Sequence, residues 1–72
     1  MTIRQLAHAV GDYTTLRIID SYMGNTYYAA SCIRFRNNIS KYEYMLDWKV
    51  SSIDIGQGNY SAWLNVYVEV EY

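Results

Sequence analysis

His8 is the first side chain in this sequence with the chemistry of a catalytic base, because histidine exchanges protons near neutral pH. A catalytic histidine needs a nucleophile or an orienting carboxylate within hydrogen-bond reach. His8 lies on the polar side of the short helix expected at the start of the chain. A histidine in such a position is usually solvated, and we interpret His8 in this way.

Cys32 is the single cysteine and the one thiol available as a nucleophile. An activated thiolate needs a cation, a histidine or a helix N-terminus beside it. Arg34 and Arg36 share the expected strand face of Cys32, but we prefer to interpret it as a half-buried strand residue. One cysteine and one histidine also exclude an internal disulfide and a four-ligand zinc site within one chain.

The acidic residues and glycines form no recognisable ligand site. Glu69 and Glu71 project from the same face of the expected last strand, but cation sites usually gather several oxygens on a preformed loop. The segment Gly56-Gln57-Gly58 lacks the strand-to-helix context and the Lys-Ser/Thr pair of a phosphate loop. We therefore expect no catalytic residue, no metal and no cofactor, and predict that the chain is not an enzyme. An active site shared across a dimer interface would revive the enzyme interpretation.

Length and charge narrow the class of protein. Seventy-two residues are enough for one domain, residues 1–72. Six basic and seven acidic residues give a net charge of −1, which disfavours nucleic acid as a partner. The sequence has no run of about 20 apolar residues and no signal peptide at its start, so we expect no membrane association. A single unpaired cysteine fits a reducing compartment, and we expect a cytoplasmic protein.

The first three expected elements are a short helix and two strands. Thr2 and Gln5 stand at the two positions of a capping box, and Gly11 stands where a left-handed residue would end the helix. Strands are expected over residues 13–20 and 26–36, joined by the turn Met23-Gly24-Asn25. In the second strand the core face is expected to carry Tyr27, Ala29, Ser31, Ile33 and Phe35, and the opposite face Tyr28, Ala30, Cys32, Arg34 and Arg36.

The second half of the chain predicts a helix and a hairpin. Ser40 and Glu43 suggest a capping box for a short helix from about Lys41 to Asp47. Residues 50–55 are expected to form a strand, residues 56–59 a hairpin loop, and residues 60–72 a strictly alternating last strand. A last strand of that length would span about 43 Å, so we expect a bend, a frayed end or an overhang that pairs with something else.

These elements predict an α+β fold with the order α-β-β-α-β-β. Short connections favour antiparallel neighbours, so we expect a four-stranded, mainly antiparallel sheet with one helix packed on a face. The expected core consists of Ile3, Leu6, Val10, Leu16, Ile18, Ile33, Phe35, Leu46, Ile53, Ile55, Leu64, Val66 and Val68.

Aromatic side chains provide the strongest functional signal. Nine tyrosines cannot all lie in the core of so small a domain, so several are expected at the surface. Trp63 and Tyr67 lie on the outer face of the last strand, and exposed clusters of Trp and Tyr mark interfaces. The alternative is that the second helix folds across this face and buries both rings beneath Tyr42, Tyr44, Met45 and Trp48.

A second expected surface is a basic and aromatic stripe formed by Tyr28, Arg34 and Arg36. Alternating basic and aromatic side chains on a sheet can stack and neutralise single-stranded nucleic acid. Only Lys41 and Lys49 are placed to join these residues, so nucleic-acid binding remains an alternative.

The segment TIRQLAHAVGDYTTLRIIDS, followed later by YEYMLDWKVSSIDI, resembles a group of short proteins encoded by phages and prophages of Gram-positive bacteria. The shared features are an amphipathic helix, a strand of the form xDYTxLRIxD, a glycine turn and a YxxxLDxxVxSI segment before the last hairpin. The resemblance covers most of the chain and transfers no functional residues. Such genes often lie among small anti-defence proteins, including anti-CRISPR inhibitors, so the resemblance implies an inhibitor that binds and blocks a host effector.

We therefore expect a non-enzymatic protein-binding module that forms a homodimer through the sheet face or an edge. As a phage-encoded inhibitor it would block a bacterial defence effector by steric occlusion. The expected contact residues are Trp63, Tyr67, Tyr28, Arg34 and Arg36. A small nucleic-acid-binding regulator and a structural phage component are the alternatives.

Overall fold

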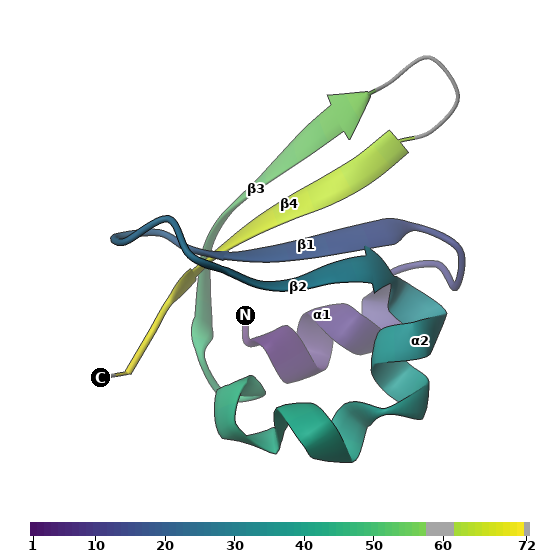
Figure 1. Ribbon diagram of the computed structural model, residues 1–72, viewed down its shortest axis with the longest axis horizontal. Coiled ribbons are helices and arrows are strands. Elements are labelled where there is room, and N and C mark those ends of the chain that lie inside the picture. Colours follow the sequence, from purple (N-terminus) through teal and green to yellow (C-terminus); the bar gives the residue numbers. More distant parts are fainter. Residues whose placement is uncertain (58–61, 72) are drawn as a thin grey trace.

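One face of a four-stranded sheet carries all the helices that the structure describes (Figure 1). The computed structural model describes residues 1–57 and 62–71. Its elements are helix α1 (Ile3–Ala9), strands β1 (Thr15–Asp20) and β2 (Thr26–Ser31), helix α2 (Cys32–Asn37), the 3-10 helix η1 (Ile39–Met45), and strands β3 (Lys49–Gln57) and β4 (Ala62–Glu69). The predicted α+β fold and its element order are confirmed.

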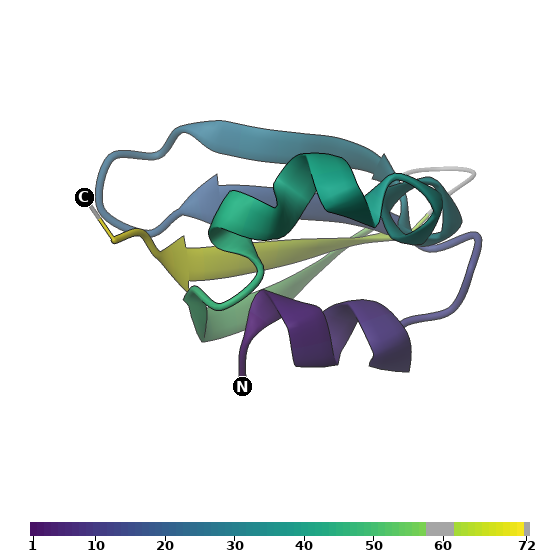
Figure 2. The same ribbon diagram turned by 90° about the horizontal axis from the view of Figure 1, so that it is seen from below.

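The strand order is β2-β1-β4-β3. Both outer pairs, β1 with β2 and β3 with β4, are antiparallel as expected, whereas the central pair of β1 and β4 is parallel. A parallel pair needs a crossover, and the chain makes it through α2 and η1 beneath the sheet. Figure 2 shows α1, α2 and η1 together on one side of the strands. Residues 58–61 and 72, on which parts of the predicted hairpin loop and last strand fall, lie outside the described residues.

Helix α1 begins with the predicted capping box. The Thr2 hydroxyl accepts from the amide of Gln5, and the Gln5 side chain accepts from the amide of Thr2. The expected left-handed ending at Gly11 is wrong, since the positive-φ glycine of the described chain is Gly24, at 78° in the turn between β1 and β2. The same turn is held by the buried Asp20, whose carboxylate accepts from the amides of Tyr22 and Met23. The carbonyls of Ala7 and Val10 at the end of the helix instead accept from the side chain of Arg36 in α2.

The predicted strand over residues 26–36 is wrong in its second half, where the chain turns into α2 after Ser31. The first two amides of α2, from Cys32 and Ile33, donate to the carbonyls of Thr14 and Asp12, both at 2.9 Å. The Cys32 bond extends the β1–β2 register by one position, and the Ile33 bond to Asp12 leaves that register. Helical spacing then buries Cys32 and Phe35 together, which strand alternation had placed on opposite faces.

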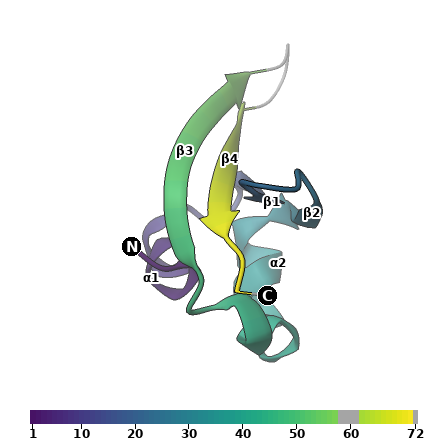
Figure 3. The same cartoon turned by 90° about the vertical axis from the view of Figure 1, so that its left-hand side faces the viewer.

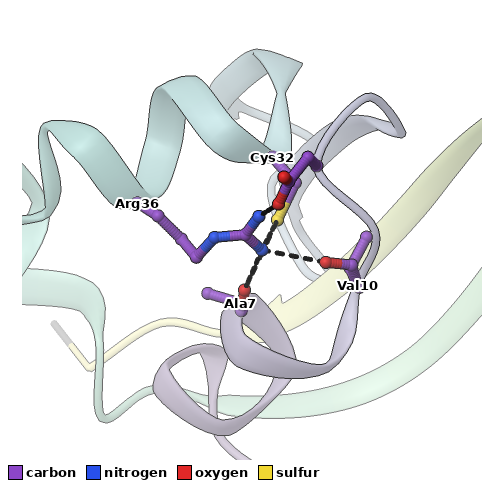
Figure 4. A network of polar contacts seen from close by, with 5 residues as sticks. Ala7, Val10, Cys32 and Arg36 are labelled. Atoms are coloured by element: carbon purple, nitrogen blue, oxygen red, sulfur yellow. Dashed lines mark hydrogen bonds and ion pairs between the residues drawn. The ribbon is translucent and has the colours of Figure 1, made fainter.

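Arg36 joins α2 to the end of α1 (Figure 4). One nitrogen of its guanidinium donates to the carbonyls of Ala7 and Val10, both at 2.8 Å, and to the sulfur of Cys32 at 3.3 Å. The other terminal nitrogen forms an ion pair with Asp12. The prediction that Arg36 faces solvent is therefore wrong, because its side chain is only 22% exposed.

Aromatic rings fill the space between the sheet and the helix layer. Tyr28 lies edge-on to Phe35 and to Tyr42, and Phe35 stacks on Tyr42 with ring centroids 4.8 Å apart. The prediction of a solvent-facing Tyr28 is wrong, since only 7% of this residue is exposed. Its hydroxyl donates to the carbonyl of Ser31, and burial, followed by the neighbouring Tyr42, raises the pKa of Tyr28.

The second predicted helix is present as η1, with different boundaries and a different start. Asn38 occupies the N-cap position without a side-chain capping bond, so the capping box predicted for Ser40 and Glu43 is wrong. Leu46 at its end is buried as expected, and Met45 and Trp48, which were not among the expected core residues, are buried as well. Trp48 lies edge-on to Tyr27 of β2, and the carbonyls of Leu46 and Trp48 accept from the amides of Arg4 and Ile3 in α1.

Replacing Arg36 with Met keeps the length of the side chain but removes every donor. The carbonyl of Val10 then loses its Arg36 donor and that of Ala7 keeps only the Cys32 thiol, so we expect the free energy of unfolding to fall by about 2–3 kcal/mol. Urea titration followed by circular dichroism measures the change. Arg34→Met is the matched control, because Arg34 is exposed on the same helix, and should change stability by less than about 0.5 kcal/mol. Equal losses in both variants would contradict the role given to Arg36.

Cys32 predicts a pH dependence of stability. Burial raises the pKa of the Cys32 thiol, so the folded protein keeps the proton at a pH where the unfolded chain releases it. The stabilisation is complete below the unfolded pKa of about 8.5 and is lost as pH rises above it. We expect the urea concentration at the unfolding midpoint to decrease in the natural sequence as the pH is raised from about 8 to about 9.5. In Cys32→Ala the midpoint should change less over the same range. Parallel curves for the two proteins would refute this assignment.

Candidate interaction surfaces

The sheet face opposite the helices is called the open face. At its centre, three residues each from β1, β4 and β3 lie side by side in three rows. Strand register places β1 and β3 residues beside each outward residue of β4. The rows, read from β1 through β4 to β3, are Thr15-Trp63-Gly56, Arg17-Asn65-Asp54 and Ile19-Tyr67-Ser52. The alternative that the second helix buries Trp63 and Tyr67 is wrong, because that helix lies on the other face. Both side chains are half-buried by their neighbours within the sheet.

Trp63 lies over Gly56 of the neighbouring strand. A Cβ atom at Gly56 would stand 2.1 Å from the indole nitrogen of Trp63 and 2.3 Å from its Cε2. No side chain fits there without moving the ring, so the indole packs directly against the backbone of Gly56. A glycine in a strand often marks such a close approach, and an aromatic neighbour compensates for its missing side chain.

The middle row of the open face is polar and incompletely paired. Asn65 lies between Arg17 and Asp54, and its Oδ1 atom is buried with no hydrogen-bond partner among the described residues. In the same part of the chain, Arg17 and Asp54 take part in no ion pair. A buried amide oxygen without a partner costs on the order of 1–3 kcal/mol. Arg17 and Asp54 are at least partly open to solvent, so the unmet hydrogen-bonding capacity of this row lies at Asn65 Oδ1.

The β3–β4 hairpin extends beyond the helix layer (Figures 1 and 3). Ile53 and Ile55 point to the helix side of the sheet, in register with Val66 and Leu64, yet they are 44% and 67% exposed. The prediction that both belong to the core is wrong, because they are exposed. The prediction that they point to the helix side of the sheet is right. Alternation predicts the side of the sheet, but none of the described helices reaches far enough along the hairpin to cover them.

Strand β3 is also an edge of the sheet. Only its beginning is covered, because Thr2 forms an antiparallel bridge with Lys49 and the amide of Val50 donates to the carbonyl of Met1 at 2.9 Å. From Ser52 onward no described strand pairs with the free side of β3. An edge of this kind presents unpaired backbone groups that can accept another strand.

The structure separates the remaining residues expected to bind a partner. Arg34 is exposed, whereas Tyr28 is buried and Arg36 is bound to backbone carbonyls of α1 and the loop after it, so the predicted stripe does not exist. The signal that strand reasoning missed is the spacing of Cys32 and Phe35, which suits a helix as well as a strand end. Surface tyrosines are present as expected, with Tyr13, Tyr22 and Tyr44 all exposed.

The residues considered for catalysis lie apart. His8 is exposed on α1, and Cys32 is fully buried rather than half-buried. Within residues 1–57 and 62–71, no group of three or more His, Cys, Asp and Glu side chains is placed to hold a metal, and no pocket is found. None of the helices described in that range is long and apolar enough to cross a membrane.

Comparisons of this chain with protein-family models, with curated proteins and with solved structures found no match.

Gly56→Ala tests the packing of Trp63. The added methyl group displaces the indole from the backbone of residue 56, and we expect the free energy of unfolding in urea to fall by about 1–3 kcal/mol. Gly11→Ala is the control, because its new Cβ would meet only Thr14 Oγ1 at an ordinary 3.5 Å. In a Trp63→Ala background the cost of Gly56→Ala should disappear. A cost that persists without the indole would show that the ring is not the cause.

Proposed function

We propose that this chain is a non-enzymatic protein-binding module and that its β3–β4 hairpin is the docking element. The proposal is that an extended segment of a partner protein lies along the free edge of β3, adding a strand to the sheet. The observation that carries it is the exposure of Ile53 and Ile55, at 44% and 67%, on an edge strand without a covering helix.

Two kinds of contact support this mode of binding. Unpaired backbone groups from Ser52 onward offer main-chain hydrogen bonds, and strand addition draws its affinity from such bonds. Ile53 and Ile55 alternate with Asp54, so they offer a partner strand an apolar strip on one face. Burying an isoleucine side chain contributes about 1.5–3 kcal/mol, which is enough for the pair to dominate a small interface.

Charge favours a protein over nucleic acid as the partner. Around the open face Arg17 and Lys49 are matched by Asp54 and Glu69, and the whole chain carries a net charge of −1. Nucleic-acid binding depends on an excess of basic residues that displaces counterions from phosphates. The predicted basic stripe, which had supported that alternative, does not form.

The resemblance to small phage and prophage proteins supports one class of partner to test first. Under this proposal the chain is an inhibitor that occupies the surface of a bacterial defence effector and blocks it by steric occlusion. Only contacts are required for that activity, and no catalytic group of this chain takes part.

The paired substitution Ile53→Ser with Ile55→Ser tests the docking element. Both side chains are exposed, so we expect the fold to persist by circular dichroism while partner affinity drops at least about tenfold, a change of about 1.4 kcal/mol. Partners are captured from a bacterial host lysate, identified by mass spectrometry, purified and titrated by calorimetry. The control is Tyr13→Ser with Tyr22→Ser, which removes side chains that are 87% and 86% exposed elsewhere. Unchanged binding by the hairpin variant would exclude the hairpin as the docking element.

A further inference from the structure

We propose that the open face binds a second copy of this chain, face to face, about a two-fold axis that lies between the two sheets and runs parallel to β4. This interface is separate from the free edge of β3 and does not depend on the hairpin's partner. It is argued from the charge order of the middle row, in which Arg17 and Asp54 flank Asn65 and form no ion pair among the described residues.

The row has opposite charges on its two sides. Arg17 on β1 and Asp54 on β3 flank Asn65 on β4, one strand away on either side. A two-fold rotation about this axis exchanges the two sides while it turns the face over. Arg17 of one copy then lies opposite Asp54 of the partner subunit, and Asp54 lies opposite Arg17 of the partner subunit. The face is thus complementary to itself, as an isologous interface must be.

Asn65 lies beside the axis and therefore faces Asn65 of the partner subunit. Asn65 is only half-buried, so the two neutral carboxamides meet at the axis without bringing like charges together. The same rotation pairs Arg17 with Asp54, neither of which has an ion-pair partner among the described residues of a single chain.

The dimensions of packed sheets suit these contacts. Two sheets that pack face to face lie about 10 Å apart, a gap that a long arginine and a short aspartate can bridge together. Trp63 and Tyr67, above and below Asn65 on the same strand, supply the apolar contact around this polar centre. Because sheets twist, only the central rows stay in register, which limits the interface to β1, β4 and β3 near the axis.

Other occupants fit this face less well. The chain's own described helices are all on the opposite side of the sheet, and the balanced charge of the face gives phosphates no net attraction. An unrelated protein would have to match the plus-neutral-minus order of the middle row. A second copy carries the matching order by symmetry alone.

A charge-swap experiment tests the proposal on the full chain. Sedimentation equilibrium of the natural sequence should show a mass that rises with concentration from 8.4 kDa toward twice that value. Arg17→Glu makes both flanks of the row acidic, and Asp54→Lys makes both flanks basic, so each variant alone should dissociate at least about tenfold more readily, since like charges then face each other. In an equimolar mixture of the two variants every acidic flank faces a basic one, and dimers should return.

Several outcomes would overturn the proposal. They are a natural sequence that stays monomeric at millimolar concentration, single variants that dimerise as well as it does, and a mixture that does not recover. Circular dichroism of each variant confirms that the fold is intact, and the double variant carrying both substitutions should dimerise again because its flanks are opposite in sign. Ile53→Ser with Ile55→Ser should leave the dimer unchanged, so this interface and the hairpin fail or succeed separately. Binding of a labelled oligonucleotide by a monomer would assign the face to nucleic acid instead.

Discussion

The guanidinium of Arg36 holds together the three segments on which the helix layer depends. It bonds the last carbonyls of α1, the sulfur at the start of α2 and the carboxylate of Asp12 in the loop between α1 and β1. That loop in turn accepts the first two amides of α2. A half-buried cation therefore binds the last carbonyls of α1, where no helix-ending glycine does so, and backbone carbonyls of the loop take the place of a side-chain cap for α2. The core beneath the sheet takes in residues of β1, β2 and β4 and Val50 at the start of β3, whereas Ile53 and Ile55 farther along β3 stay exposed.

A chain of this size has little apolar surface to spare, since small domains bury only about 60% of the surface exposed in their unfolded form. The helices supply enough bulk to seal one face around Phe35, Tyr42 and Trp48. The other face is left with Trp63 and Tyr67, and the hairpin with Ile53 and Ile55. Apolar side chains kept outside so small a core reduce its stability, a cost that the contacts proposed above would offset.

Sequence reasoning predicted the fold class, the element order, the α1 capping box and the face on which each β4 residue lies, because these follow from local patterns. It failed where two local patterns compete. Between Cys32 and Arg36 the sequence fits both strand alternation and helical spacing. The helix forms because its first amides bond the carbonyls of Asp12 and Thr14, in the loop between α1 and β1, which is far away in sequence. It also failed at Ile53 and Ile55, since periodicity reports the side of a strand and not the length of the layer beneath it. The surface expected around Tyr28, Arg34 and Arg36 depended on a strand through residue 36, so it was lost when that segment proved to be helical. Trp63 and Tyr67 were placed on the correct face.

The two proposed interfaces are geometrically compatible, and together they would change how the protein binds. A two-fold axis parallel to β4 preserves the strand direction, so both hairpins of a dimer project from the same end. It also places the free β3 edges on opposite sides of the sheet pair, where neither is covered by the other copy. Such a dimer offers two equivalent docking edges, and engagement of both by one assembly would raise avidity well above the affinity of a single edge. A small chain that binds weakly through two isoleucines would thereby hold a multivalent target far more firmly than its contact area suggests.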